Sequence, residues 1–342
     1  MADDGLYLLM ADRLSRPADL LAPVHEYVWD AVHFPPIWPL LLGALGAGSE
    51  SPEGAYLVTA LCAALAGGAF ALWMFRERPH DRLAPCVGLL AVLTPGWVMF
   101  SQEPWSEFLF CIFAFSALHA ERTDRWHVAA VLCVGAFFVR TAGVALLAGL
   151  IACLVLRRPR GAVSAAATAL VPAAAWSLLL ARTATEDAYL SMLWRKWSTT
   201  GPEAIPGLLH SDASAMLWGI AANLSFAPEL VAFTLGVGLL LLGLLGALQR
   251  ARQGRLDGFI LLTYLAMVWL WPWPSHAQRL LLPLVPLLAA HGYIFLAEAT
   301  PGWHRLLPIA LCVVLFPAWA QIATRAAIGA PEGAHEYLHS RF

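Results

Sequence analysis

Four acidic residues stand where a short polar segment meets an apolar run, and each could act as a general base. Asp3 and Asp4 open the chain's first segment, and Glu103 and Glu107 precede the apolar run that starts at residue 108. A positioned carboxylate can take the proton of an attacking hydroxyl or amine. Adjacent acids on a helix point about 100° apart, so only one of Asp3 and Asp4 can aim at a given point. Helix capping by Asp3 and compensation of a helix dipole by Glu107 are the alternatives.

Two arginines lie within apolar sequence, where a charge is costly and by default marks a functional site. Arg140 follows Phe138 and Val139, and Arg279 precedes three leucines and a proline. An arginine fork can bind two oxygens of one phosphate group. Snorkelling of the side chain to the membrane interface is the alternative for both residues. Arginines and carboxylates at a lipid boundary together favour chemistry on a phosphate-linked substrate.

The composition indicates what must position these groups. Of the 342 residues, 60% are hydrophobic and only 13% are charged, and the mean hydropathy is +0.67. Soluble domains carry about 45–50% apolar and about 25% charged residues, so an ordinary soluble enzyme and a disordered chain are excluded. The 21 basic residues do not outnumber the 23 acidic ones, which excludes a nucleic-acid partner. Because the apolar runs are continuous, we expect an all-α polytopic transmembrane helix bundle.

About ten membrane spans are expected, because the apolar runs are long enough, or nearly so, to cross a hydrocarbon core of about 30 Å. As one helix, the run 127–156 would be about 45 Å long, so we expect it to turn near Arg140 and Gly143 and to cross twice. Residues 37–48 rise only about 18 Å as a helix and are interpreted as interfacial or re-entrant, with a short true span as the alternative. The expected spans lie in the runs 55–75, 84–100, 106–120, 127–156, 162–182, 228–249, 257–272, 278–297 and 303–320.

Arginine-rich short loops predict the orientation. By the positive-inside rule, all five loops belong in the cytoplasm. They contain, in order, Arg76, Arg78 and Arg82; Arg122 and Arg125; Arg157, Arg158 and Arg160; Arg250, Arg252 and Arg255; and Arg305. The outer side then holds three segments. Residues 1–54 form an external loop with juxtamembrane helices, residues 183–227 form a long external loop of the bundle 55–320, and residues 321–342 form an external tail. We expect a multi-pass protein of the inner (plasma) membrane with its site on the extracytoplasmic side.

Four motifs on this predicted outer side occur in a familiar order. They are an acidic pair followed by an aromatic residue (DDGLY, 3–7), a His-x-Pro-Pro segment (HFPPIWP, 33–39), an acid at the head of a helix (SEFLF, 106–110) and an arginine-proline element (RLLLPLVP, 279–286). The pattern resembles the integral-membrane GT-C glycosyltransferases, especially the bacterial relatives of protein O-mannosyltransferases and of the aminoarabinose transferase.

The resemblance implies a GT-C-like fold and an inverting sugar transfer from a polyprenyl-phosphate donor on the outer face. Asp3 would be the catalytic base and Asp4 its neighbour, while Glu107 would position the acceptor or the donor. Arg279 would bind the donor phosphate, and Arg140 is a weaker match to an arginine of the family. The residues that line the substrate site would be Tyr7, His33, Glu103 and His276.

The expected partners are the polyprenyl-phosphate-linked sugar, membrane lipid and an acceptor, which could be a glycan, a lipid or a protein. No cofactor is implied, and a divalent metal stays an open alternative. The family has a transmembrane helix before the acidic pair, and this sequence shows none. Either the start is misplaced, the chain is a fragment, or Asp3 is not catalytic. A transporter or lipid flippase and a non-catalytic membrane subunit of an envelope-assembly complex are the competing hypotheses.

Overall fold

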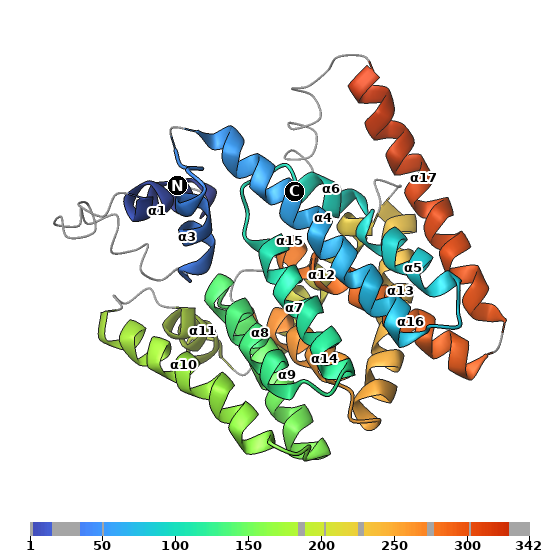
Figure 1. The fold of residues 1–342 in the computed structure, drawn as a ribbon. Coiled ribbons are helices and arrows are strands. Elements are labelled where there is room, and N and C mark those ends of the chain that lie inside the picture. Colours follow the sequence, from blue (N-terminus) through green and yellow to red (C-terminus); the bar gives the residue numbers. More distant parts are fainter. Residues whose placement is uncertain are drawn as a thin grey trace.

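The structure is a computed structural model that describes residues 3–15, 35–49, 51–183, 189–201, 203–224, 229–271, 277–300 and 302–327. Within these ranges the regular structure is helical, and no strand occurs (Figure 1). The first half forms α1 (Asp3–Ser15), α3 (Ile37–Ala44), α4 (Pro52–Glu77), α5 (Leu83–Val92), α6 (Pro95–Phe100), α7 (Glu107–Arg122), α8 (Trp126–Val139), α9 (Gly143–Arg157) and α10 (Ala162–Thr183). The second half forms α11 (Tyr189–Ser198), α12 (Ile205–Leu224), α13 (Glu229–Arg252), α14 (Leu256–Trp269), α15 (Ala277–Leu281), α16 (Leu284–Ala299), η4 (Trp303–Arg305) and α17 (Leu306–Ala327).

Polar residues and prolines divide the apolar runs into these helices. The predicted turn within 127–156 is confirmed, because α8 ends at Val139 and α9 begins at Gly143. The run 84–100 was expected as one span but forms α5 and α6. Pro95 starts α6, and the Thr94 hydroxyl caps it by accepting a hydrogen bond from the amide of Trp97. Pro283 likewise separates α15 from α16 within the expected run 278–297.

Some helices of this bundle are long and apolar enough to be candidates for membrane spans. Among the described residues, three helical stretches are long and apolar enough to cross a membrane, Pro52–Glu77, Ala162–Leu179 and Phe233–Arg252. Other apolar helices, such as α8, α9, α14 and α16, are shorter. The fold is therefore an all-helical bundle with membrane-spanning candidates, while the expected total of about ten spans stays a prediction.

The two faces of α4 show how such a helix sits in the bundle. Leu57, Leu61 and Leu65 recur every four residues, and each is more than half exposed. Phe70 and Trp73 on another face are fully buried, and Phe70 contacts Phe115 of α7 with ring centroids 4.8 Å apart. A leucine stripe on the surface of a helix with this length fits contact with lipid.

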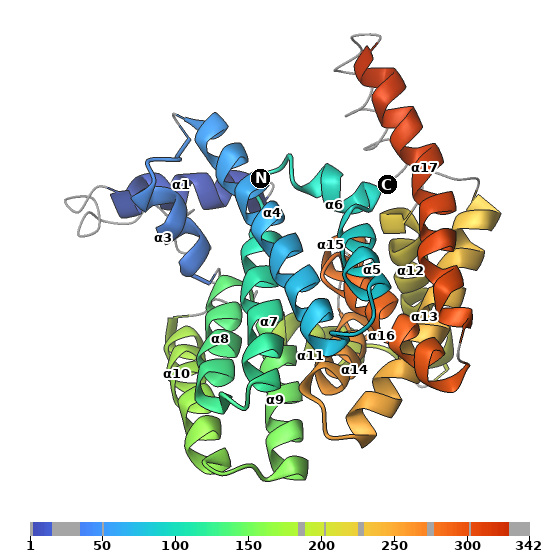
Figure 2. The same ribbon diagram turned by 45° about the vertical axis from the view of Figure 1, so that its right-hand side comes forward.

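The five arginine-rich loops lie at one end of the bundle, as predicted. Side-chain contacts connect them at distances up to 4.0 Å: Arg78–Glu298, Arg122–Glu77, Arg157–Glu121, Arg255–Glu77 and His304–Asp81. We call this the arginine-loop end, and the opposite end, where α7 begins, the Glu107 end. Figure 2 shows the α9–α10 and α13–α14 connections at the former and α1, α3 and α6 toward the latter. α7 separates the two ends by about 24 Å.

The helix pair α1 and α3 is attached to the Glu107 end. The Asp12 carboxylate of α1 accepts hydrogen bonds from the amide and hydroxyl of Ser49, just after α3. Gly43 of α3 lies against α1, because a Cβ there would be 2.7 Å from the carbonyl oxygen of Ala11. The indole of Trp38 donates to the carbonyl of Pro104 at 3.0 Å, which joins α3 to the turn before α7. The expected short helix after Pro35 and Pro36 is thus present as α3.

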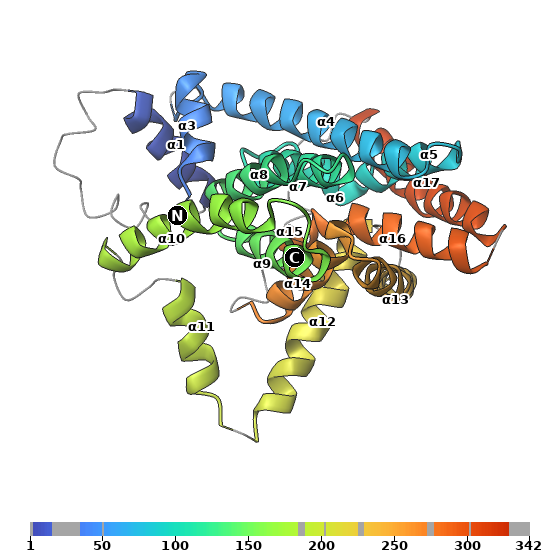
Figure 3. The same ribbon diagram turned by 60° about the horizontal axis from the view of Figure 1, so that its bottom comes forward.

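Two segments predicted as external loop and tail contain helices. Residues 183–227 hold α11 and α12, which form the two arms of a V in Figure 3. Lys196 of α11 pairs with Asp212 of α12 at 2.7 Å, and this ion pair is buried between the arms. In the tail, α17 continues through residue 327, and the rest of the tail lies outside the described residues.

Candidate functional site

Glu107 is the first residue of α7 and the centre of a buried charged cluster. Its carboxylate is only 1% exposed, and its Oε1 contacts the guanidinium groups of both Arg140 and Arg279. The second oxygen, Oε2, is also buried and has no hydrogen-bond partner among the described residues. The position at a helix start favours a negative charge, but two arginine partners show that Glu107 does more than compensate a dipole.

Arg140 reaches this cluster because the chain turns there. It ends α8 in an extended conformation, and its Nη1 also donates a hydrogen bond to the hydroxyl of Ser106 at 3.2 Å. Gly143 starts α9 so close to α8 that a Cβ would clash with the backbone of Phe137. The tight hairpin therefore places an arginine from one end of α8 beside the head of α7.

Arg279 comes from the short helix α15, far along the chain. Its guanidinium carbon lies 4.2 Å from the ring centre of Trp105, within the range of a cation–π contact. Trp105 lies in the turn before α7, so the same turn that introduces Glu107 also supports Arg279. The side chain of Arg279 is 14% exposed and that of Arg140 is 13% exposed. Both groups are thus largely enclosed.

Tyr7 completes the cluster from α1. It is 3% exposed, and its hydroxyl oxygen accepts a hydrogen bond from the hydroxyl of Ser106 at 3.5 Å. Burial raises the pKa of the Tyr7 phenol, an effect that the nearby Arg140 and Arg279 oppose, so the phenol stays protonated at neutral pH. Asp3 and Asp4 precede Tyr7 by one helical turn on α1, which brings their backbone to the same end of the bundle.

The structure brings together Tyr7, Glu107, Arg140 and Arg279 among the predicted site residues. Their spacing of 33 to 139 residues leaves no local pattern that would predict this proximity. Glu103 lies in the turn before α7 and is half-buried. The side chains of Asp3 and Asp4, and all of His33 and His276, lie outside the described residues.

Sequence reasoning missed two residues of the cluster, Ser106 and Trp105. Ser106 is fully buried and contacts Arg140 and Tyr7, and Trp105 lies beneath the guanidinium of Arg279. Both stand directly before Glu107 in the sequence. Their position next to the predicted acid Glu107 was the only sequence feature that could have indicated them. Serine and tryptophan are common near the start of a helix, so this feature was weak.

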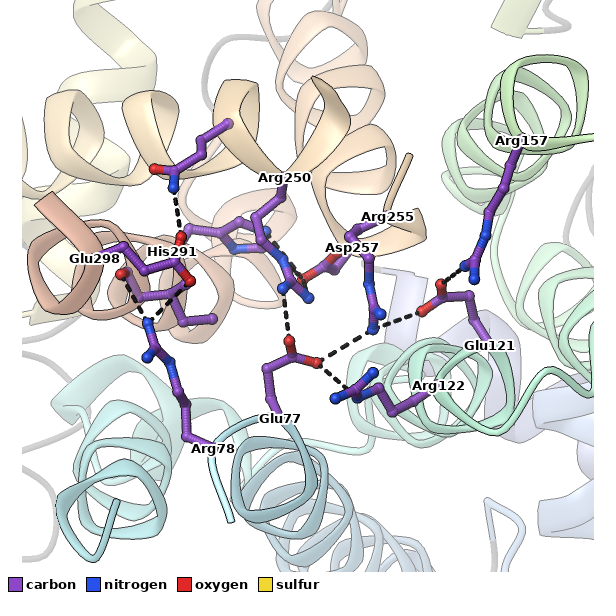
Figure 4. Close-up of polar contacts among 12 residues, drawn as sticks. Glu77, Arg78, Glu121, Arg122, Arg157, Arg250, Arg255, Asp257, His291 and Glu298 are labelled. Carbon is purple, nitrogen blue, oxygen red and sulfur yellow. Dashed lines mark hydrogen bonds and ion pairs between the residues drawn. The ribbon is translucent and has the colours of Figure 1, made fainter. Parts of the chain in front are cut away.

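A second charged cluster lies at the arginine-loop end and is drawn in Figure 4. Glu77, the last residue of α4, receives three arginines: Arg250 at 2.6 Å, Arg255 at 3.2 Å and Arg122 at 3.3 Å. A carboxylate at a helix C-terminus is unfavourable by itself. The three arginines come from α7, from α13 and from the loop before α14, so Glu77 connects these elements to α4.

Two further carboxylates extend this network. Glu121 of α7 contacts Arg157 at 2.7 Å and Arg255 at 3.2 Å. Asp257 of α14 contacts Arg250 at 2.8 Å and lies 3.6 Å from Nε2 of the fully buried His291. Each carboxylate has at least one arginine partner, and the network joins α4, α7, α9, α13, α14 and α16 (Figure 4). We assign it the structural role of holding the helices together at this end.

The two clusters differ in what they could bind. Arg140 and Arg279 share a single carboxylate oxygen, and each guanidinium carries five N–H donors in a fork that matches phosphate. At the arginine-loop end, carboxylates and arginines alternate, and Arg250 and Arg255 each contact two different carboxylates. The Glu107 cluster is therefore the candidate site. Among the described residues, no group of three or more His, Cys, Asp and Glu side chains is arranged to hold a metal ion.

No known protein family, curated protein or solved structure matches the chain.

Proposed function

We propose that the chain is a membrane glycosyltransferase that moves a sugar from a polyprenyl-phosphate donor to an acceptor on the outer face, with inversion. The convergence of Arg140 and Arg279 on the buried Glu107 carries this proposal. Two guanidinium groups held side by side are suited to a phosphate, and the apolar bundle around them is suited to a polyprenyl chain.

The chemical step assigns a task to each part of the cluster. The acceptor oxygen or nitrogen attacks the anomeric carbon of the sugar as the bond from that carbon to the phosphate oxygen breaks. The bonding electrons leave with the phosphate, which changes from a diester to a monoester and gains negative charge. Arg140 and Arg279 stabilise that charge as it develops. Attack opposite the leaving phosphate inverts the anomeric centre.

The proton of the acceptor passes to a carboxylate, and we assign this role to Asp3, with Asp4 as its neighbour. Glu107 is a weaker base, because two guanidinium groups stabilise its ionised form. We assign to Glu107 the task of holding the arginines, while its Oε2 accepts a hydrogen bond from a substrate hydroxyl. Tyr7 lies on the same helix as Asp3 and is joined to Arg140 through the hydroxyl of Ser106, which fits α1 as the element that carries the base.

The membrane arrangement belongs to the same proposal. The arginine-loop end would face the cytoplasm, the Glu107 end would face outward, and the bundle would cross the inner membrane about ten times. α1 and α3 would lie at the outer interface beside the site. The acceptor would approach from that side.

A single-turnover assay tests the proposal. Purified protein in nanodiscs is mixed with polyprenyl phosphate carrying mannose, glucose or a pentose, together with lipid, glycan and peptide acceptors. The proposal predicts transfer from one of these donors. In Asp3→Asn, turnover falls by about 10²–10⁴ while donor binding stays within twofold. If Asp3→Asn transfers sugar at the parent rate and Glu103→Gln does not, the base lies in the turn before α7.

A flippase for lipid-linked sugars is the second candidate, because two helices with a break in them both contact α12. Broken helices are typical of transporter binding sites. The α5/α6 break at Thr94 and the α15/α16 break at Pro283 both lie in segments that contact α12. Movement of a fluorescent polyprenyl-phosphate sugar across vesicles without sugar transfer would favour this function over the transferase.

A further inference from the structure

The chain between Trp271 and Gln278 leads to Arg279, and a lysine of α11 holds its first residue, Trp271. Lys196 of α11, the single lysine of the chain, donates to Asp212 of α12 at 2.7 Å and to the carbonyl of Trp271 at 2.9 Å. The Lys196 and Asp212 side chains are 12% and 3% exposed, so the ion pair is largely removed from water. The ammonium group of Lys196 thus joins α11 both to α12 and to the chain directly after α14.

The other end of this stretch is fixed by α12 directly. The side-chain amide of Asn223 donates to the carbonyl of Gln278 at 2.8 Å, and Asn223 is fully buried. Gln278 is the immediate neighbour of Arg279. Gly219 lets α12 approach α15, since a Cβ there would lie 2.7 Å from a methyl group of Leu281 and 3.0 Å from the amide nitrogen of Gln278.

Asp212, Gly219 and Asn223 share one face of α12. Their spacings of seven and four residues keep them within about 40° around the helix axis. This face therefore contacts Gln278 directly and is joined to Trp271 through Lys196, which bonds both Asp212 and the Trp271 carbonyl. The indole of Trp269 adds a hydrogen bond to the carbonyl of Leu209 at 3.3 Å, which joins the end of α14 to the same helix.

We propose that Lys196, Asp212 and Asn223 are positioning residues that hold Arg279 where it can bind the donor phosphate. The inference rests on the proposed function and deepens it, because it assigns part of the outer segment 183–227 to donor binding. These residues act through Arg279, by fixing the backbone at Trp271 and at Gln278, the residue directly before Arg279. Arg140 needs no such support, since the α8–α9 hairpin places it.

The test uses Lys196→Met, which removes the ammonium group and keeps the apolar stem, and Lys196→Arg, which keeps the charge. Arg195→Met, an exposed basic residue next to Lys196 on α11, is the matched control. The first readout needs no donor: hydrogen exchange of the backbone amides of residues 277–281. We expect about tenfold faster exchange in Lys196→Met, near-parent rates in Lys196→Arg and Arg195→Met, and no change in α7.

The second readout is the Kd of polyprenyl phosphate in nanodiscs. We expect Lys196→Met to bind five- to tenfold more weakly than the parent, and to add less than twofold to the loss caused by Arg279→Ala. Such non-additivity is what a residue that acts through another must show. Unchanged exchange at 277–281, or fully additive losses in the double variant, would overturn the inference. If the parent does not bind polyprenyl phosphate, the proposed function fails, and the exchange rates still decide whether these contacts hold the Arg279 segment.

Discussion

Replacing Glu107 by glutamine should destabilise the empty protein and strengthen its binding of phosphate. The substitution keeps the shape of the side chain and removes the charge that holds two guanidinium groups together. Opposite charges about 4 Å apart attract by about 4 kcal/mol at an effective dielectric constant of 20. Removing one partner of a buried ion pair costs about 3–5 kcal/mol. Since Arg140 and Arg279 are 13% and 14% exposed and the amide oxygen can still accept a hydrogen bond, we expect a loss of about 3 kcal/mol.

A phosphate ligand should reverse part of this loss. Without the Glu107 carboxylate, the net charge of the cluster rises by one unit, so an anion binds more tightly. A ligand that binds the folded state stabilises it by about 2.7 kcal/mol at a hundred times its Kd. Polyprenyl phosphate should therefore raise the melting temperature of Glu107→Gln by more degrees than that of the parent at the same concentration.

Thermal unfolding in detergent, with and without short-chain polyprenyl phosphate, measures both effects. Glu53→Gln is the matched control, because Glu53 lies in the first turn of another long helix and is exposed. We expect the control to melt with the parent in both conditions. A Glu107→Gln variant as stable as the parent, or one that gains no more than the parent from the ligand, would refute the reasoning about this cluster.

Three further predictions concern the bundle. Arg250→Met should lower the free energy of unfolding by about 3–5 kcal/mol in an unfolding titration, because it leaves Glu77 and Asp257 without a shared partner. The same change at the exposed Arg252 should be tolerated, and equal losses in the two variants would contradict the structural role of the network. A cysteine at position 158 should resist a membrane-impermeant thiol reagent in intact cells, while one at position 210 should react, and the reverse pattern would refute the orientation. Thr94→Ala should cost about 1 kcal/mol by removing the cap of α6, and no change in the melting temperature would show that Pro95 alone sets this helix start.

The apolar runs predicted most helices of the bundle, but not α11 and α12, which lie in the predicted external loop 183–227. The turn at Arg140 was predicted for two reasons. Residues 127–156 connect two arginine loops expected on the same side, and the run is too long for one helix. The prediction of one span each for 84–100 and 278–297 was wrong, because the helix breaks before Pro95 and at Pro283. A proline can start, kink or end a helix, and local sequence does not decide which outcome the tertiary contacts select.

The candidate site was predicted in part, for a definite reason. Charges within apolar sequence are rare, so the sequence alone points to Glu107, Arg140 and Arg279, although it does not show that they lie close together. Lys196 and Asp212 were not, because they occur in a segment of mixed polarity where charged residues are expected on the surface. Their burial depends on how α11 and α12 meet, which no spacing in the sequence encodes.

The ion pairs at the arginine-loop end could not be predicted from the sequence either. Its arginines were predicted to lie in loops on one side of the membrane, and the structure places these loops together at one end of the bundle. Glu77, Glu121 and Asp257 stand next to these arginines in the sequence, but their contacts between helices come from the packing of α4, α7 and α14. Patterns of charge along a chain indicate a side of the membrane, whereas ion pairing depends on which helices are neighbours.

The most direct measurement for the proposed function is the Kd of polyprenyl phosphate for the parent and for variants of Arg279. A charge-assisted pair to phosphate contributes about 1.5–3 kcal/mol, so Arg279→Ala should bind about ten- to a hundredfold more weakly. Arg279→Lys keeps the charge and loses the fork, and should show a smaller loss. Arg305→Ala, at the other end of the bundle, should bind like the parent. Equal affinity of the parent, Arg279→Ala and Arg279→Lys would contradict a donor-phosphate site at this cluster.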